Sequence, residues 1–309
     1  METTLILKNL ASKLHASKNR HVTHEKLSGE FQNLYTDIDF IHQAIKDCII
    51  DPKVLKNANN LFFYLLISGD VIIAINLFPP ISDGALDITH DNIHHHGWRL
   101  LTTGVISGDG YDTVTFLKKS HENITNHIVN LKVEDIYKHT KSEIKFIDSY
   151  QSHVVFHPQS TTATLALWSA EKPLFNQKIK KCLKNITGVG NFFSKIARIS
   201  KLDNALGLNP SKGVYFHPEN GKIVETQNYS KPNDGTREEV LNCMFRFFQQ
   251  IKLNDTNFFS KIKKTAPPEA QILCDMLMSG EPIPDYGIKG NIRRRFSKKE
   301  ILESLDYTK

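Results

Sequence analysis

Hydrophobic residues recur every three or four positions through the first part of the chain. In the segment from Phe31 to Ile49 they fall on one side of a helix, and Asp51-Pro52 then supplies a helix stop. This spacing predicts an N-terminal helical segment over residues 1–60. The apolar positions of that face are Phe31, Leu34, Ile38, Ile41, Ile45 and Ile49.

The pattern changes to short strands between residues 61 and 170. The segments VIIAINLF, HHHGWRLLTTGVIS, YDTVTFL and TTATLALWS are rich in β-branched and aromatic residues, and turn sequences such as Gly-Asp and Pro-Pro bound them. Strands at this spacing without strong helices between them favour a sandwich or a barrel. We therefore expect an α+β chain with a β-barrel at its centre.

Helical periodicity returns over residues 171–309. It marks PLFNQKIKKCLKNI, TREEVLNCMFRFFQQIKL, PPEAQILCDMLMSG and SKKEILESL, the last with a capping box of Ser297 and Glu300. The segment YFHPENGK instead predicts a hairpin that turns at Asn220-Gly221, with His217 in a structural role. This mainly helical region is expected to pack on the barrel or to form a small second domain.

The most apolar run, from Leu61 to Pro80, approaches the length of a membrane span. Ser68-Gly69-Asp70 interrupts it at the middle, which favours two buried strands joined by a tight turn. The N-terminal segment has a short apolar patch followed by basic residues, the reverse of the order in a secretory signal. We expect a cytoplasmic protein without a membrane partner.

Composition narrows the function classes only a little. The chain has 309 residues, 40% of them hydrophobic, and a formal charge of +6. Its four cysteines are far apart, which favours reduced thiols over a disulfide framework or a cysteine-based zinc site. The basic stretch from Lys289 to Lys299, with Arg293, Arg294 and Arg295, could bind nucleic acid, but a solvated loop before a helix is the favoured interpretation.

A cluster of histidines at the start of one predicted strand is the strongest chemical signal. Side chains alternate along a strand, so His94 and His96 point to one side and His95 to the other. Two imidazoles placed in this way can share one metal ion. Either His153 or His157, at the start of another strand, could supply a third ligand.

These residues resemble the first and second motifs of the cupin superfamily. His94-x-His96, with Gly108 twelve residues after the second histidine, resembles the first motif, and HVVFHP resembles the second, with His153 as its ligand. Typical cupins add a glutamate where this chain has Leu100 and Leu101. A site of three histidines without that carboxylate is similar to the thiol dioxygenases, such as cysteine dioxygenase, which implies ferrous iron and dioxygen.

The substrate-binding parts of the thiol dioxygenases have no clear counterpart in the sequence. Their Ser–His–Tyr set has its His and Tyr on the last barrel strand, and the matching TATLALWS contains neither residue. Their carboxylate-binding arginine has no match upstream, and alternation puts Arg99 on the His95 side, away from the metal. The resemblance therefore implies a different substrate.

Several further residues are candidates for the site. Trp98, Leu100 and Thr102 share the alternation of His94 and His96, so they are expected to line the same cavity, with Trp98 either a substrate wall or core packing. Tyr111 is expected near the barrel mouth, and His157 near the metal. His90 and Asp91 could orient a ligand imidazole from behind. The predicted catalytic residues are Trp98, Tyr111 and His157.

The leading hypothesis is a mononuclear non-heme iron oxygenase in which His94, His96 and His153 hold Fe(II) and a small polar or anionic substrate, such as a thiol, reacts with O₂. Zinc, manganese or nickel are the alternative metals. A non-catalytic cupin that senses a ligand or binds a partner, and a zinc- or manganese-dependent isomerase or hydrolase, are the competing functions. A homodimer is expected by analogy with cupins.

Overall fold

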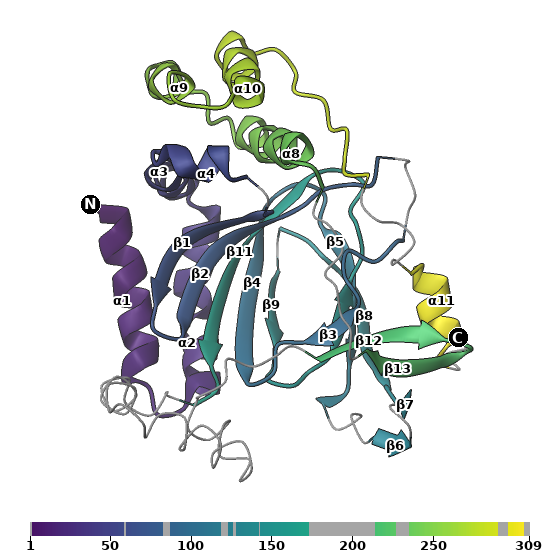
Figure 1. Ribbon diagram of the computed structural model, residues 1–309. Coiled ribbons are helices and arrows are strands. Elements are labelled where there is room, and N and C mark those ends of the chain that lie inside the picture. Colours follow the sequence, from purple (N-terminus) through teal and green to yellow (C-terminus); the bar gives the residue numbers. More distant parts are fainter. Residues whose placement is uncertain are drawn as a thin grey trace, which may run out of the picture.

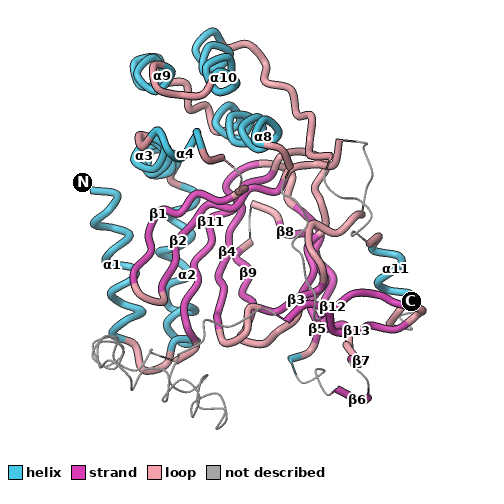
Figure 2. Tube along the Cα trace, in the orientation of Figure 1, coloured by secondary structure: helices cyan, strands magenta, loops and turns pink. Residues whose placement is uncertain are grey.

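The computed structural model describes residues 2–58, 60–82, 87–118, 123–125, 128–141, 143–172, 214–226, 235–289 and 296–305. Helices occur at both ends of this described part, and strands occupy its centre (Figures 1 and 2). The helices are α1 (Glu2–Ala16), α2 (Arg20–Thr36), α3 (Ile38–Ile49), α4 (Pro52–Lys56), α8 (Arg237–Gln250), α9 (Thr256–Lys263), α10 (Pro268–Ser279) and α11 (Lys298–Glu303).

The strands form two antiparallel sheets. One has the order β1-β2-β11-β4-β9 and the other the order β6-β7-β13-β12-β3-β10-β5-β8. The strands are β1 (Phe62–Ser68), β2 (Val71–Phe78), β3 (Ile93–His95), β4 (Arg99–Ser107), β5 (Tyr111–Phe116), β6 (Asn123–Thr125), β7 (Ile128–Val129), β8 (Val133–His139), β9 (Ile144–Ile147), β10 (His153–Val155), β11 (Thr162–Ala170), β12 (Val214–Glu219) and β13 (Lys222–Thr226).

The mixed helix and sheet class is confirmed. The five-stranded sheet curls around one side of the molecule (Figure 1), and the eight-stranded sheet faces it across a cavity lined from both. No strand pairing joins the two sheets within the described residues. A closed cupin-type barrel therefore stays a prediction.

The outer face of the five-stranded sheet supports most of the helices (Figure 2). Alternate residues of β2 and β11, such as Ile73, Ile75 and Leu165, are buried against α1–α3 and α8 in the main hydrophobic core. The intervening residues of these strands therefore point to the other face, toward the cavity. Because one face of the sheet is apolar and covered, the other face is available for polar groups.

The predicted single apolar face from Phe31 to Ile49 is wrong at one point. The helix ends at Thr36, and Asp37 caps a new helix by accepting hydrogen bonds from the backbone N–H groups of Asp39 and Phe40. The new helix runs in another direction, and Ile38 at its start is 41% exposed. The apolar spacing alone does not reveal this interruption. The signal for it is Asp37, whose side chain caps the start of the second helix.

The predicted continuous strand from His94 to Ser107 is also wrong. The chain leaves the eight-stranded sheet after β3 and enters the five-stranded sheet at β4, and the turn passes through Gly97 with φ of +62°. Glycine adopts this left-handed conformation without a steric penalty. The histidines and the residues after Gly97 therefore belong to different sheets.

Several helix and turn predictions of the C-terminal region are confirmed. Thr236 and Glu239 form a capping box at α8, Ser297 and Glu300 form one at α11, and Gly280 ends α10 with a left-handed φ. The expected helix PLFNQKIKKCLKNI and the arginine run 293–295 lie outside the described residues.

The predicted hairpin at Asn220-Gly221 is present as β12 and β13. Both turn residues have positive φ, as a tight two-residue hairpin turn requires. β12 pairs with β3, the strand that carries His94. The eight-stranded sheet thus includes a hairpin from the region after residue 170. The division of the chain into domains at residues 60 and 170 stays a prediction.

No helix within the described residues combines the length and the apolar character that crossing a lipid bilayer would require.

A buried ion pair joins the helices to the five-stranded sheet. The Arg20 guanidinium donates to the Asp70 carboxylate, and their side chains are 1% and 8% exposed. Asp70 also accepts a hydrogen bond from the backbone N–H of Ala170, and Arg20 donates to the carbonyl of the same residue. This one contact ties together the start of α2, the β1–β2 turn and the end of β11.

Replacing Asp70 with alanine should lower the free energy of unfolding by about 3–5 kcal/mol, because the Arg20 charge is left buried without its partner. Denaturation in urea, followed by circular dichroism, measures this loss. The matched control is the Lys13–Glu30 pair, whose side chains are about half exposed. Lys13→Ala should change stability by at most about 1 kcal/mol. Equal effects of the two substitutions would contradict the importance of burial.

Candidate metal centre

Three histidines from two neighbouring strands converge at one point. His94 on β3 pairs directly with His153 on β10, and His96 follows β3 by one residue. One nitrogen of each ring lies within 4.8 Å of the others. The ring centroids are 4.5, 4.8 and 5.0 Å apart. The structure therefore brings the three predicted ligands together, and their binding of an ion stays a prediction.

Backbone carbonyls orient two of these rings. His94 Nδ1 lies 2.8 Å from the carbonyl of Asn92, and His153 Nδ1 makes a longer contact of 3.5 Å with that of Gln151. A carbonyl oxygen can only accept, so in both rings Nδ1 carries the hydrogen and Nε2 carries a lone pair. Ligand histidines in metal sites are held in this same way.

The spacing of the Nε2 atoms fits a bound cation. His94 Nε2 and His96 Nε2 are 3.2 Å apart. Two nitrogens bound to one ion at about 2.05 Å lie about 2.9 Å apart at 90° and about 3.3 Å apart at a tetrahedral angle. The observed distance falls between these values, so His94 and His96 fit one shared metal ion.

Burial keeps two of the rings neutral. It lowers the pKa of His96 and the pKa of His153 well below the ordinary value of 6.5, and the neighbouring histidines lower both further. A neutral imidazole is the form that binds a metal. At neutral pH both rings are therefore ready to act as ligands.

The three histidines line a small cavity between the two sheets. Its volume is about 130 Å³, and its wall also includes His90, Tyr111, His139 and Trp168. A second, more open cavity of about 290 Å³ lies beside it. The two cavities share Phe62, His96 and Trp168, so His96 stands between them.

Arg99 lies beside the cluster, contrary to the alternation argument. It lines the second cavity together with His96, Trp168 and Tyr215. The turn at Gly97 interrupts the strand, so the alternation of β3 does not extend into β4. Within the described residues, the Arg99 guanidinium forms no hydrogen bond or ion pair, so it presents an unpaired positive charge to this cavity.

The same turn reverses the other positions expected to line the site. Leu101 and Thr103 face the inner cavity, whereas Leu100 and Thr102 do not line either cavity. The Thr102 hydroxyl instead contacts His24 Nδ1 at 2.7 Å, on the side covered by α2. Trp98 also lines neither cavity within the described part of the chain, and Trp168 on β11 takes the position expected for it.

The other predicted site residues divide between the cavity and its surroundings. Tyr111 lines the inner cavity, as do His90 and Asp91. His157 lies outside the wall: its Nδ1 contacts the carbonyl of Pro79 at 2.7 Å, and its ring packs 5.0 Å from that of His90. It therefore does not line the cavity that contains the three histidines.

The wall of the inner cavity contains a tyrosine–histidine pair. It does not come from β11, the strand TATLALWS, where the resemblance to thiol dioxygenases would have put it. Tyr111 on β5 contacts His139 Nδ1 on β8 at 3.0 Å. His139 Nε2 donates to the carbonyl of Glu143 at 3.2 Å, and burial lowers the pKa of His139 to about 4. The neutral ring therefore accepts at Nδ1, and the Tyr111 hydroxyl donates to it.

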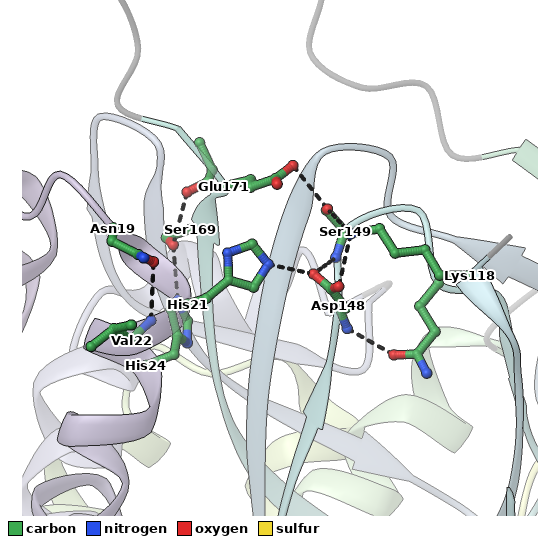
Figure 3. Close-up of polar contacts among 11 residues, drawn as sticks. Asn19, His21, Val22, His24, Lys118, Asp148, Ser149, Ser169 and Glu171 are labelled. Atoms are coloured by element: carbon green, nitrogen blue, oxygen red, sulfur yellow. Dashed lines mark hydrogen bonds and ion pairs between the residues drawn. The ribbon is translucent and has the colours of Figure 1, made fainter. Parts of the chain in front are cut away.

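The loop between β9 and β10 contacts His21 of α2 through Asp148 (Figure 3). Asp148 in this loop binds His21 at 2.6 Å and Lys118 at 2.7 Å. Two residues on, the backbone N–H of Tyr150 donates to the carbonyl of Gly97 at 2.5 Å. This loop thus holds the Gly97 turn on one side and leads directly into His153 on the other.

The comparisons with known proteins give no family. No family model and no curated protein matches the chain. Solved structures with partial similarity include a DMSP lyase (12% identity, 35% of this chain and 46% of that one, TM-score 0.24). Less than half of that lyase chain is covered.

Two further solved structures are similar over comparable shares of the chain. One is an uncharacterized protein with a double-stranded β-helix domain from Klebsiella pneumoniae (16% identity, 37% of this chain and 80% of that one, TM-score 0.23). The other is hydroquinone 1,2-dioxygenase PnpCD (10% identity, 38% and 69%, TM-score 0.26). TM-scores of this size do not establish a common fold.

Replacing His153 with alanine should weaken metal binding by at least about a hundredfold, because one of three ligands is lost. Even the loss of a residue that only hydrogen-bonds to a ligand lowers metal affinity by up to about a hundredfold. Titration of metal-free protein with Co(II), followed by visible absorption, measures the change. His217, which stacks on Phe296 outside both cavities, provides the control. His217→Gln should bind Co(II) like the wild type. Wild-type affinity in His153→Ala would show that the histidines do not share an ion.

Proposed function

We propose that the chain is a metal-dependent enzyme of the cupin type, and that it is a mononuclear non-heme Fe(II) oxygenase acting on a small anionic substrate. The observation that carries this proposal is the convergence of three imidazoles, two of which are oriented by backbone carbonyls so that Nε2 carries a lone pair. His96 Nε2 lies 3.2 Å from the Nε2 lone pair of His94, which is close enough for both nitrogens to bind one cation when His96 is also protonated at Nδ1.

The ligand set favours an anionic substrate. Three neutral imidazoles leave the double charge of the ion uncompensated, and within the described residues no carboxylate joins the three-histidine group. A thiolate or a carboxylate is therefore attracted to the ion. A ferrous ion in this site would supply open coordination positions at which substrate and dioxygen meet.

The protein's own residues select and enclose this substrate. Arg99 offers a planar guanidinium beside His96, which suits a carboxylate held by two parallel hydrogen bonds. The inner cavity of about 130 Å³ is smaller than the roughly 300 Å³ at which pockets for drug-sized ligands begin. Phe62 and Trp168 line both cavities, so we expect their side chains to limit the access of water to the inner one.

Protein purified without added metal should contain iron, and it should consume oxygen when supplied with one member of a panel of small thiols and carboxylic acids. Metal analysis and an oxygen electrode test this, with His153→Ala as the control that loses both properties. Zinc at full occupancy without oxygen uptake would contradict the oxygenase. Substrate turnover without oxygen would instead indicate an isomerase or hydrolase that uses its metal as a Lewis acid.

Replacing Arg99 with leucine should weaken the binding of small carboxylates by about tenfold to a hundredfold, since a hydrogen bond to a charged group contributes about 1.5–3 kcal/mol. The measurement is a carboxylate titration of Co(II)-loaded protein. Arg99→Lys keeps the charge but loses the paired geometry, so its affinity should lie between those of wild type and Arg99→Leu. Metal content should stay unchanged in both variants. Identical affinities in all three proteins would exclude Arg99 from substrate binding.

A further inference from the structure

We infer that the inner cavity contains a second recognition subsite, formed by Asn76 and Tyr111, that binds a neutral hydroxyl or carboxamide group of the substrate. The inference rests on the proposed function in one respect: the other end of the same substrate is taken to bind at the histidine cluster. The substrate class is thus a small acid or thiol with a second, uncharged polar group.

Asn76 has a buried amide oxygen that forms no hydrogen bond within the described part of the chain. It lies on β2 within the apolar segment VIIAINLF, lines the inner cavity and is 8% exposed. Its Oδ1 is buried and has no hydrogen-bond partner within the described residues. Buried polar groups are nearly always hydrogen-bonded, so we take this unpaired amide oxygen beside the cavity as the point at which a polar ligand group binds.

The position of Asn76 separates it from the helix-facing core. Its neighbour Ile75 packs into the main hydrophobic core, so alternation points Asn76 to the other face of the sheet. In the pairing with β11 it stands directly across from Thr164. An apolar residue at position 76 would make a more stable strand, so the amide is not explained by packing.

Tyr111 adds a hydrogen-bond acceptor from the facing sheet. Its hydroxyl donates to the neutral His139 ring, so toward other groups its oxygen acts as an acceptor, with the Thr103 and Thr164 hydroxyls as neighbouring donors. Burial raises the pKa of Tyr111, so the phenol keeps its proton. Asn76 lines the same cavity from the five-stranded sheet, as the histidine cluster does from the eight-stranded sheet.

The chemistry of this subsite selects a neutral group. An asparagine amide both donates and accepts, and Tyr111 accepts, so the best complement is a group that also does both. A hydroxyl and a carboxamide meet this requirement. The subsite residues Asn76, Tyr111 and His139 carry no charge at neutral pH, so a charged group there would lose its hydration without gaining a counter-charge from them.

The test compares matched ligand pairs on Co(II)-loaded full-length protein. Each pair compares an acid with the parent acid that lacks the second polar group. The shorter pairs are 3-hydroxypropionate with propionate and malonamate with acetate. The longer pairs are 4-hydroxybutyrate with butyrate and succinamate with propionate. Visible absorption reports binding at the metal. For at least one chain length, the wild type should bind the polar acid at least tenfold more tightly than its parent.

Two substitutions then locate the preference. Asn76→Leu removes the amide at similar volume, and Tyr111→Phe removes only the hydroxyl, so at least one folded variant is expected. In each, the ratio of affinities should fall toward one, while Co(II) binding and the affinity for the parent acid stay within about twofold of wild type. A wild-type protein without the preference, or variants that retain it, would overturn the inference and leave the proposed metal centre intact.

Failure of the proposed function has a different signature. If the wild type binds no Co(II), the same ligand pairs are compared on the metal-free protein by calorimetry. A preference for the polar ligand that Asn76→Leu abolishes would then support the subsite without the metal centre. Equal binding, or no binding of either ligand, would overturn the subsite as well.

Discussion

The turn through Gly97 is the constraint on which the arrangement of the site depends. The chain must pass from one sheet to the other within three residues, and Gly97 permits this with a left-handed φ of +62°. Before the turn, His94 and His96 meet His153 beside the eight-stranded sheet. After the turn, Arg99 is the first residue of β4 in the facing sheet, and it lines the second cavity together with His96. One residue thus puts metal ligands and a cationic side chain around the same space.

Local signals in the sequence were sufficient for most elements of the fold. Helix periodicity and caps predicted α8, α10 and α11, and the Asn220-Gly221 dipeptide predicted the hairpin. These features depend on residues a few positions apart, so their physics is contained in a short window. The His-x-His spacing belongs to the same class, because two neighbouring side chains on extended chain necessarily share a side.

The parts of the site that the sequence did not predict depend on pairing between distant strands. Tyr215 reaches the second cavity only because β12 pairs with β3, and no local pattern specifies that register. His139 meets Tyr111 through the pairing of β5 with β8. Arg99 and Leu100 were assigned to the wrong sides because alternation was carried across Gly97. A glycine between two strand segments is a reason to restart that count, since it can end one strand and begin another.

The two faces of the five-stranded sheet serve different physical purposes. The outer face is apolar and buried under the helices, where it supplies stability through the removal of hydrocarbon surface from water. The inner face carries Asn76, Thr103 and Thr164 at positions where apolar residues would pack without unsatisfied groups. A protein can keep such groups in its interior because the covered outer face, with the Arg20–Asp70 contact at its end, holds the sheet in place independently. The polar inner face is therefore free to be shaped by what the cavity binds rather than by folding.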